Sequence, residues 1–417
     1  MASSGLLLGI VTCVFSGCVA AFGLHLLSIC ATKTSHRRSS FFAVSEITFP
    51  RAAVFFDAAI AIKCFGVSIS YLIIIKGLAP SVLKSLFHVT SPATELPDWS
   101  LDGRVWVTIF MFILAPLCFL KKLDSLRHTS YIAIVSVVYL VVVVITCYYK
   151  PPKGSTPPGE VHLIRFSGTF LSTFPVQVFA FTCAQNLFPI YNELYQNTQK
   201  RMNTIIGSAI GTATIIYEVV SIFGYLTFGS KVGANIIAMY PSTTLFIAFG
   251  QFAIMINVMC SYPLQVHPCR NSMEKVVSFT KKLPAESNQV NHPEEDDSDE
   301  SSHDGDLDHV PPPISTTKHI VLTTIIVVLG YGVAFFVNDL QMVLSFVGST
   351  GSTTISFILP GLLYFKMFRK DTSQPRRKTW FALALAGYGV CILIFCLSYN
   401  IYRAVGGYRG THPSAPH

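Results

Sequence analysis

Residues 174–194, FPVQVFAFTCAQNLFPIYNEL, form an apolar span long enough to cross a bilayer, yet the span contains groups that a lipid-facing helix would not choose. Pro175 and Pro189 each remove a main-chain donor. Polar side chains also fall at membrane depth, namely those of Gln177, Thr182, Gln185 and Asn186. Unpaired amides in hydrocarbon cost several kcal/mol each, so this helix is expected to be buried in protein or to line a wet cavity. Broken helices of this kind build the midplane sites of secondary transporters, whereas the alternative is a proline-kinked packing helix.

The overall composition is that of a polytopic membrane protein. The chain has 417 residues, of which 51% are hydrophobic and 12% charged, and its mean hydropathy is +0.52. Soluble domains carry about 25% charged residues. All of the eleven cysteines except Cys269 lie in apolar spans, so we interpret them as small hydrophobic residues and not as a disulfide framework. The net charge of +8 comes from basic residues in short loops between spans, which excludes a nucleic-acid-binding class.

Ten segments contain the roughly 20 predominantly apolar residues that a membrane-spanning helix needs. The expected fold is therefore an all-α polytopic membrane protein with ten transmembrane helices. The third segment is short and the ninth is rich in Gly, Ser and Thr, so these two have the least defined boundaries. The segments are residues 5–30, 52–75, 104–120, 129–149, 168–190, 203–228, 244–266, 319–337, 340–365 and 379–402.

The distribution of basic residues gives the orientation of these spans. Of the thirty Lys and Arg, twenty lie in the loops after spans one, three, five, seven and nine, and nine lie in the other loops and tail. Lys63 alone is left inside a span. Cytoplasmic loops carry the excess of Lys and Arg, so the first set of loops is predicted to be cytoplasmic. Met1 is then on the opposite face of the membrane.

The longest interruption between spans is expected to be a disordered acidic cytoplasmic loop. It covers residues 272–317, and residues 294–308 within it hold nine of the twenty-two acids of the chain. Low hydrophobicity and high charge predict disorder. The loop separates helices one to seven, in residues 1–271, from helices eight to ten, in residues 318–402. A short non-cytoplasmic tail, residues 403–417, follows.

Four ionisable residues fall within or near the spans, where such groups are functional candidates. Glu218, midway along span six, is the best candidate for a proton-coupled role, and its alternative is a structural pair between helices. Asp57 and Lys63 are six residues apart, about 240° round a helix, so they do not face one another. Asp57 lies near the predicted cytoplasmic end, where it can snorkel or cap, and His25 is interpreted as interfacial.

Two further segments offer hydroxyl groups to a ligand. Ser261 comes just before Pro263 breaks the cytoplasmic end of span seven. Residues 346–361, FVGSTGSTTISFILPG, place Ser349 and Thr350 between two glycines that permit close helix approach. These oxygens can serve a cation or a substrate, and the equally weighted alternative is a packing face of small residues.

Three separated motifs resemble one family. FAFTCAQNLFPIYNEL, YPLQVHPCR and FVGSTGSTTISFILPGLLYFK, in this order and spacing, resemble the amino acid/auxin permease family, and within it most resemble the vacuolar amino acid transporters of fungi and the neutral amino acid transporters of animals. The resemblance covers residues 3–402. It implies a LeuT-type inverted repeat of eleven helices that moves amino acids in symport or antiport with H⁺ or Na⁺. The vacuolar membrane is the implied location, with the plasma membrane as the alternative.

The resemblance also implies the site residues. Span five corresponds to the broken sixth helix of the family, and its substrate-binding residues are then Phe179, Ala180, Phe181, Thr182 and Cys183. Span seven corresponds to the eighth helix, where Ser261 is near a cation-facing hydroxyl. With it, Ser349, Thr350 and Glu218 complete the candidates for the coupling ion. No cofactor, metal or nucleic acid is implied, and the partners are an amino acid, the coupling ion and the lipid bilayer.

The chain departs from the family pattern at its start. The first helix of the family carries a Gly-rich unwound segment, and no such segment precedes Ser4, so the ten spans match family helices two to eleven. These spans alone are expected not to transport, because half of a LeuT-type site lies on the first helix. A non-transporting sensor or scaffold is therefore the alternative function. A channel is disfavoured and an enzyme excluded, since neither a pore ring nor a catalytic motif is found in the sequence.

Overall fold

The computed structural model describes residues 1–34, 39–90, 97–120, 129–152, 154–155, 157–241, 244–286, 316–371 and 375–409. Of residue 51 and of residues 88–90, 279–286 and 406–409 it describes the backbone alone. Within these ranges the chain forms helices and connecting turns and no strand. The all-α prediction is confirmed.

The helices follow the predicted spans. The long ones are α1 (Leu6–Ala31), α3 (Ala53–Thr90), α5 (Gly103–Cys118), α6 (Thr129–Tyr149), α9 (Gln199–Phe228), α11 (Leu245–Glu286), α12 (Thr316–Phe336) and α15 (Arg376–Arg409). Shorter ones are α2 (Phe41–Thr48), η1 (Pro50–Ala52), α4 (Asp98–Leu101), α7 (Phe170–Ala180), η3 (Ala184–Asn186), α8 (Leu187–Glu193), η4 (Gly229–Lys231) and α10 (Ile236–Met239). The ninth span is one continuous run of α13 (Leu340–Val347), the π-helical turns η5 (Gly348–Ser352) and η6 (Thr354–Ile358), and α14 (Leu359–Phe368).

The number of membrane crossings differs from a simple count of long helices. Eight helices in the described ranges are long and apolar enough to span a bilayer. The other two predicted spans are present in different forms: α5 has only 16 residues, and residues 168–190 are divided between α7 and α8. The chain is thus a multi-pass membrane protein, and a count of ten crossings stays a prediction.

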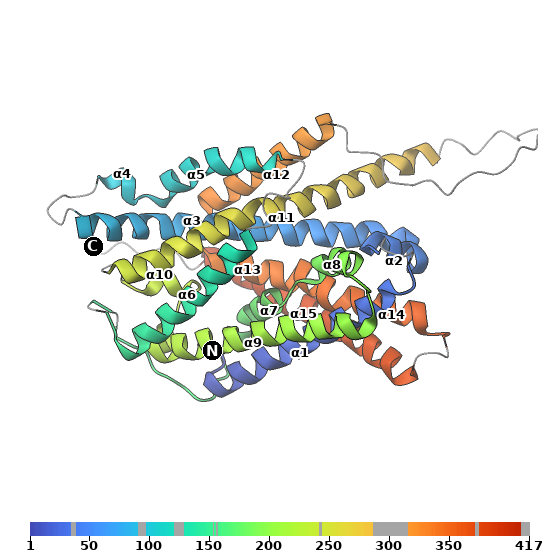
Figure 1. The fold of residues 1–417 in the computed structure, drawn as a ribbon, viewed down its shortest axis with the longest axis horizontal. Helices are drawn as coiled ribbons and strands as arrows, with labels where there is room; N and C mark the ends of the chain where they lie inside the picture. The colour runs from blue at the N-terminus through green and yellow to red at the C-terminus, as the bar shows by residue number, and fades with distance from the viewer. Residues whose placement is uncertain are drawn as a thin grey trace, which may run out of the picture.

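Loops from distant parts of the chain meet at one end of the bundle. In Figure 1, α2, α8, α14 and the C-terminal end of α11 lie at the right, and α4 and α10 lie at the opposite end. Lys33, which follows α1, forms an ion pair of 3.4 Å with Asp371, which follows α14. Lys366 of α14 lies 5.5 Å from the centre of the Phe49 ring. Loops predicted to be cytoplasmic therefore share one end, as the basic residues indicated.

Helix α11 extends further than expected, and the predicted break at Pro263 is wrong because the helix continues through this residue. The linker was predicted to start at residue 272, but the helix continues to Glu286, and only residues 287–315 lie outside the description. The reason is visible in the side chains of Met273, Val276 and Val277, which recur at helical spacing. They line an apolar hollow together with residues of α3 and α12.

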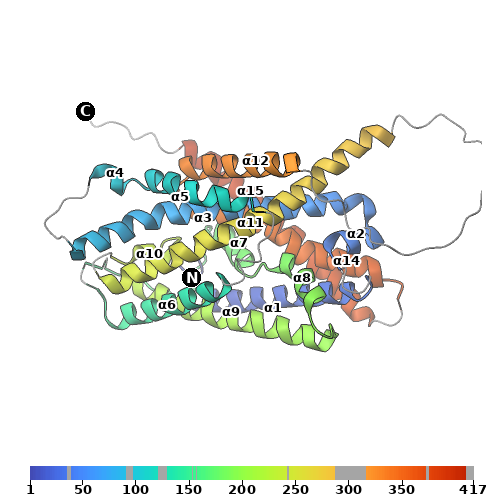
Figure 2. The ribbon, with the colours of Figure 1, turned by 45° about the horizontal axis from the view of Figure 1, so that its top comes forward.

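Four helices, α3, α5, α11 and α12, lie together in both views of the bundle (Figures 1 and 2), and α11 and α3 make the most extensive contact in it. Two buried cations join them at helix ends. Lys76 Nζ of α3 donates to the carbonyls of Ala334 (2.5 Å) and Val337 (2.8 Å) where α12 ends. Arg270 of α11 donates to the carbonyl of Cys118, at the end of α5, and to Thr323 Oγ1 of α12. Both cations therefore donate to carbonyl groups that have no helical partner at the end of a helix, and Arg270 also donates to a side-chain hydroxyl.

Candidate functional site

The central helix is interrupted as the sequence predicted. Helix α7 ends at Ala180, residues 181–183 are not helical, and α8 begins at Leu187 after the turn η3. Pro189 explains where the second half starts. It lies in the first turn of α8, where a main-chain N–H has no helical partner, so its missing N–H costs no hydrogen bond. If the helix began earlier and included Gln185, the proline ring would clash with the main-chain carbonyl of Gln185.

The hydrogen bonds around the break leave several main-chain groups unpaired. The Thr182 amide donates to Phe179 O (3.0 Å), and the Tyr217 hydroxyl donates to Ala180 O (3.0 Å). The Asn186 amide donates to Cys183 O (2.9 Å). Among the bonds made by the described residues, none involves the amides of Cys183, Ala184 and Gln185 or the carbonyls of Phe181 and Thr182. Donors and acceptors therefore lie next to one another at membrane depth, which is the property of a break that binds a solute.

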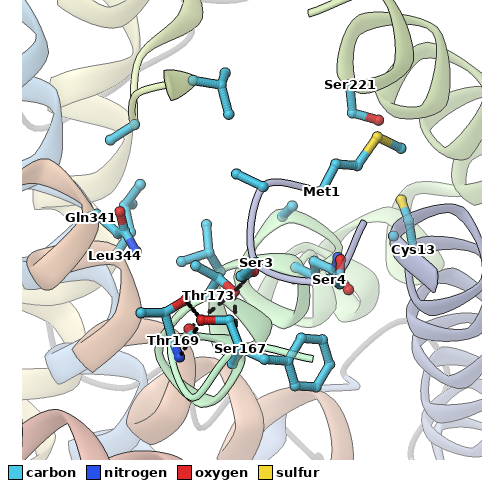
Figure 3. A pocket seen from close by; sticks show the side chains of 18 of the residues that line it. Met1, Ser3, Ser4, Cys13, Ser167, Thr169, Thr173, Ser221, Gln341 and Leu344 are labelled. Carbon is cyan, nitrogen blue, oxygen red and sulfur yellow. Dashed lines mark hydrogen bonds between the residues drawn. The ribbon is translucent and has the colours of Figure 1, made fainter. Parts of the chain in front are cut away.

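A cavity of about 610 Å³ reaches the break from one side. Its floor includes Ala180 and Phe181. In Figure 3, Met1, Cys13 and Ser221 face Gln341 and Leu344 across the open space, and Thr169 and Thr173 lie below it. Residues of the predicted non-cytoplasmic loops also line it, including Arg165, Ser230 and Arg403. The volume is within the range of about 300–1,000 Å³ typical of small-molecule sites.

The predicted substrate residues fall at different depths relative to this cavity. Ala180 and Phe181 line it, and the Phe181 ring contacts the ring of Tyr217 edge-on, with centres 5.2 Å apart. The Thr182 hydroxyl donates to Val178 O (2.7 Å) and accepts from Ser356 Oγ (3.2 Å). Phe179 and Cys183 are not among the lining residues. The five positions therefore surround the break, but two of them meet the cavity.

The predicted coupling-ion residues lie on three separate elements. Ser349 and Thr350 are in η5, and both hydroxyls donate to Phe346 O, at 3.2 and 2.7 Å. Ser261 of α11 donates to Asn257 O at 2.8 Å. A hydroxyl that donates its hydrogen bond to a helix carbonyl still has its oxygen lone pairs available for a cation. The hydrogen bonds of the described residues join only Ser349 and Thr350, through their shared acceptor, so the structure does not gather the set into one site.

Glu218 is half-buried on α9, beside the cavity. Its carboxylate lies beside the Cys13 thiol of α1, which is a weak donor. Neither carboxylate oxygen has a stronger hydrogen-bond partner among the described residues. The Glu218–Cys13 contact joins α9 to α1, so it is a structural pair between helices of the kind considered from the sequence, and a proton-coupled role for Glu218 stays a prediction.

Two residues beside the break were not identified as site residues from the sequence. Tyr217 lines the cavity and bonds the last carbonyl of α7, and its position next to Glu218 in the middle of a span was the available signal. Lys63, on α3, interacts electrostatically with Cys183 in the break. No sequence signal could show this, because α3 and the break are about 120 residues apart and meet only in the folded bundle.

The hydroxyl-rich turn η5 is held between α7 and α3. A Cβ at Gly348 would collide with the carbonyl of Pro175 on α7. A Cβ at Gly351 would lie 2.7 Å from Lys63 Cβ and 2.9 Å from Ala59 O on α3. Glycine is required at both positions because the backbones approach too closely for a side chain. The packing role considered for this segment is thus supported, and the hydroxyls lie between the two contacts.

A bundle of long apolar helices, with one helix broken beside a cavity, is typical of the class of LeuT-type transport folds. The crystal structure of MhsT in complex with L-phenylalanine matches the structure of this chain with a TM-score of 0.55. The match covers 96% of this chain and 92% of that chain, at 10% sequence identity. That likeness shows the fold, which is LeuT-type. The chain belongs to the family of transmembrane amino acid transporter proteins, whose sequence pattern matches residues 1–405.

Curated relatives are similar over nearly the whole chain. Vacuolar amino acid transporter 5 of Schizosaccharomyces pombe is 41% identical over 409 residues, which are 96% of this chain and 88% of the relative. Vacuolar amino acid transporter 6 of Saccharomyces cerevisiae is 35% identical, over 94% of this chain and 92% of the relative. The chain is therefore a member of a transporter family and not an enzyme.

Proposed function

We propose that this protein is a secondary active transporter that carries amino acids across the vacuolar membrane together with H⁺ or Na⁺. The observation that carries the proposal is the break between α7 and α8, where unpaired amides and carbonyls lie beside a cavity. The names of the relatives, which are vacuolar amino acid transporters, support both the substrate class and the membrane.

The chemistry of the break suits a zwitterion. The amides of Cys183, Ala184 and Gln185 can donate to an α-carboxylate, and the carbonyls of Phe181 and Thr182 can accept from an α-amino group. Every α-amino acid carries both groups, so main-chain recognition accepts the class without selecting one side chain. Selection among amino acids then falls to the lining of the cavity, where Phe181 and Tyr217 are aromatic and Gln177 is polar.

Two kinds of group can serve the coupling ion. For H⁺, Glu218 offers a carboxylate without a strong partner beside the cavity. For Na⁺, the hydroxyls of Ser261, Ser349 and Thr350 offer oxygen lone pairs. We favour H⁺, because Glu218 is next to two residues that line the cavity, Tyr217 and Cys13, whereas the hydroxyls lie on separate elements.

The test is transport by the protein expressed from its complete coding sequence and reconstituted into vesicles. Uptake of each of the twenty common L-amino acids is measured with an imposed pH gradient, with an imposed Na⁺ gradient, and with neither. The proposal expects at least one amino acid to accumulate under the pH gradient. Binding of an amino acid without accumulation under any gradient would instead identify a sensor or scaffold.

A further inference from the structure

Lys63 is a buried cation in the middle of the bundle. It lies on α3, the residue is 3% exposed, and its Cβ and main-chain nitrogen lie against Gly351 of η5. Ala59 and Gly66, on the same face of α3, meet Gly351 and Val347 respectively. This face of the helix therefore packs directly against the hydroxyl-rich segment and not against lipid.

Three other charged residues of the described ranges are buried, and each has a partner, whereas Lys63 has none. Lys76 donates to main-chain carbonyls and Arg270 to a carbonyl and a hydroxyl. Asp57 forms an ion pair of 3.6 Å with Lys275. Lys63 forms no ion pair or hydrogen bond with the described residues, and its electrostatic neighbours are the thiols of Cys64 and Cys183. An ammonium group at membrane depth without an anion is costly, so such a residue indicates a function that supplies the anion.

The position of Lys63 indicates which anion this is. Cys183 is the first of the three residues whose amides are unpaired at the break. The Lys63 ammonium interacts with this residue from α3. A lysine close to a run of unpaired amides offers an anion both a charge and main-chain donors, and a charge-assisted bond to carboxylate is roughly twice as strong as a neutral one.

We propose that Lys63 binds the α-carboxylate of the transported amino acid at the break, together with the amides of residues 183–185. This inference rests on the proposed transport of amino acids and names the charged group of that site. The α-carboxylate is the one anionic group that all α-amino acids share. It is the partner that a site serving the whole class requires. Ala180 and Phe181 line the cavity and Lys63 does not, so the proposal directs the carboxylate toward Lys63 and the amino acid side chain toward the cavity.

The experiment compares Lys63→Met with wild type in the same vesicles. Methionine is unbranched and of similar length, and it removes the cost of burying an ammonium group, so the variant is expected to fold. The probes are the best-transported of the twenty L-amino acids and its carboxamide, which lacks the negative charge. Lys84→Met is the matched control, because Lys84 is an exposed lysine on the same helix.

In wild type, the amino acid should compete for uptake at least about tenfold better than its carboxamide. In Lys63→Met this preference should fall to within about twofold through loss of affinity for the amino acid, with the carboxamide unchanged. Lys63→Arg, which keeps the charge, should retain part of the preference, and Lys84→Met all of it.

Uptake is repeated with gluconate in place of chloride. Chloride dependence that disappears in Lys63→Met would assign Lys63 to an inorganic anion and overturn the inference.

Two other results would also overturn it. One is an unchanged preference for the amino acid over its carboxamide in Lys63→Met. The other is failure of Lys63→Met to fold, measured as a lost melting transition, because it would show that Lys63 has a structural partner. Failure of the proposed function looks different, since wild type would then transport none of the twenty amino acids under any gradient.

Discussion

The hydroxyl of Ser356, in η6, donates a 3.2 Å hydrogen bond to the hydroxyl of Thr182, in the break between α7 and α8. The Thr182 hydroxyl itself donates a hydrogen bond to Val178 O, one turn earlier in α7. The π-helical segment and the broken helix are therefore tied at the residue where the helix stops. A movement of one against the other must break this bond or carry both elements together.

Replacing Thr182 with leucine should abolish uptake while leaving membrane insertion intact. The larger side chain intrudes where main-chain groups meet the ligand, and the bonds to Ser356 and Val178 are lost. Uptake is measured in vesicles and insertion by protease protection. Thr182→Ser, which keeps the hydroxyl, should transport. Unchanged kinetics in Thr182→Leu would mean that this stretch only packs.

Gly351→Ala should destabilise the bundle. The new methyl group would meet Lys63 Cβ at 2.7 Å and main-chain atoms of α3 at 2.9 Å, so α3 and η5 must separate. Overpacking of this kind costs about 1–3 kcal/mol. The melting temperature in detergent measures the loss. Gly211→Ala on α9 is the control, because nothing lies within 4 Å of the added atom, and it should melt no lower than wild type. Equal melting of both variants would show that η5 is not tightly held.

Lys76→Met should weaken the attachment of α12. The carbonyls of Ala334 and Val337 lose a charged donor at the end of that helix, where no further turn can satisfy them. The expected cost is about 1–3 kcal/mol, seen as a lower melting temperature. Affinity for amino acids should stay the same, because Lys76 is remote from the break in the sequence of α3. A melting temperature equal to that of Lys84→Met would show that the cap is not important for stability.

Glu218→Gln should uncouple uptake from the pH gradient. Glutamine keeps the size of the side chain but cannot take up a proton, so a transporter that uses Glu218 loses its driving ion. Accumulation under an imposed pH gradient is compared with exchange of labelled for unlabelled amino acid, which needs no gradient. Exchange should persist while accumulation is lost. Glu160→Gln, at an exposed carboxylate in a loop, is the control. Accumulation that survives in Glu218→Gln would assign the proton to another group.

The orientation of the chain can be tested with epitope tags. A tag inserted near Asp304 should be accessible from the cytosol, and a tag after Pro416 should not, because twenty basic residues lie on the first side and nine on the other. Antibody access in intact and permeabilised cells distinguishes the two. Detection of both tags on the same side would contradict the predicted topology.

The sequence predicted the helices well because hydrophobic length and charge are local properties. Each of the ten predicted spans contains helix, and the break falls where prolines and polar residues interrupt span five. The extension of α11 was missed because its apolar residues gain a partner only from α3 and α12. The site was predicted less completely for the same reason. Lys63 and Tyr217 become site residues through contacts between helices, which spacing along one helix cannot show.

The two buried cations at helix ends have a mechanical consequence. Arg270 holds α12 near its start, through Thr323, and Lys76 holds the same helix at its other end. Both cations come from α11 and α3, which also contact α5. A helix pinned at both ends cannot tilt or slide without stranding a buried charge. We therefore expect α3, α5, α11 and α12 to move as one rigid unit in any conformational change of the protein.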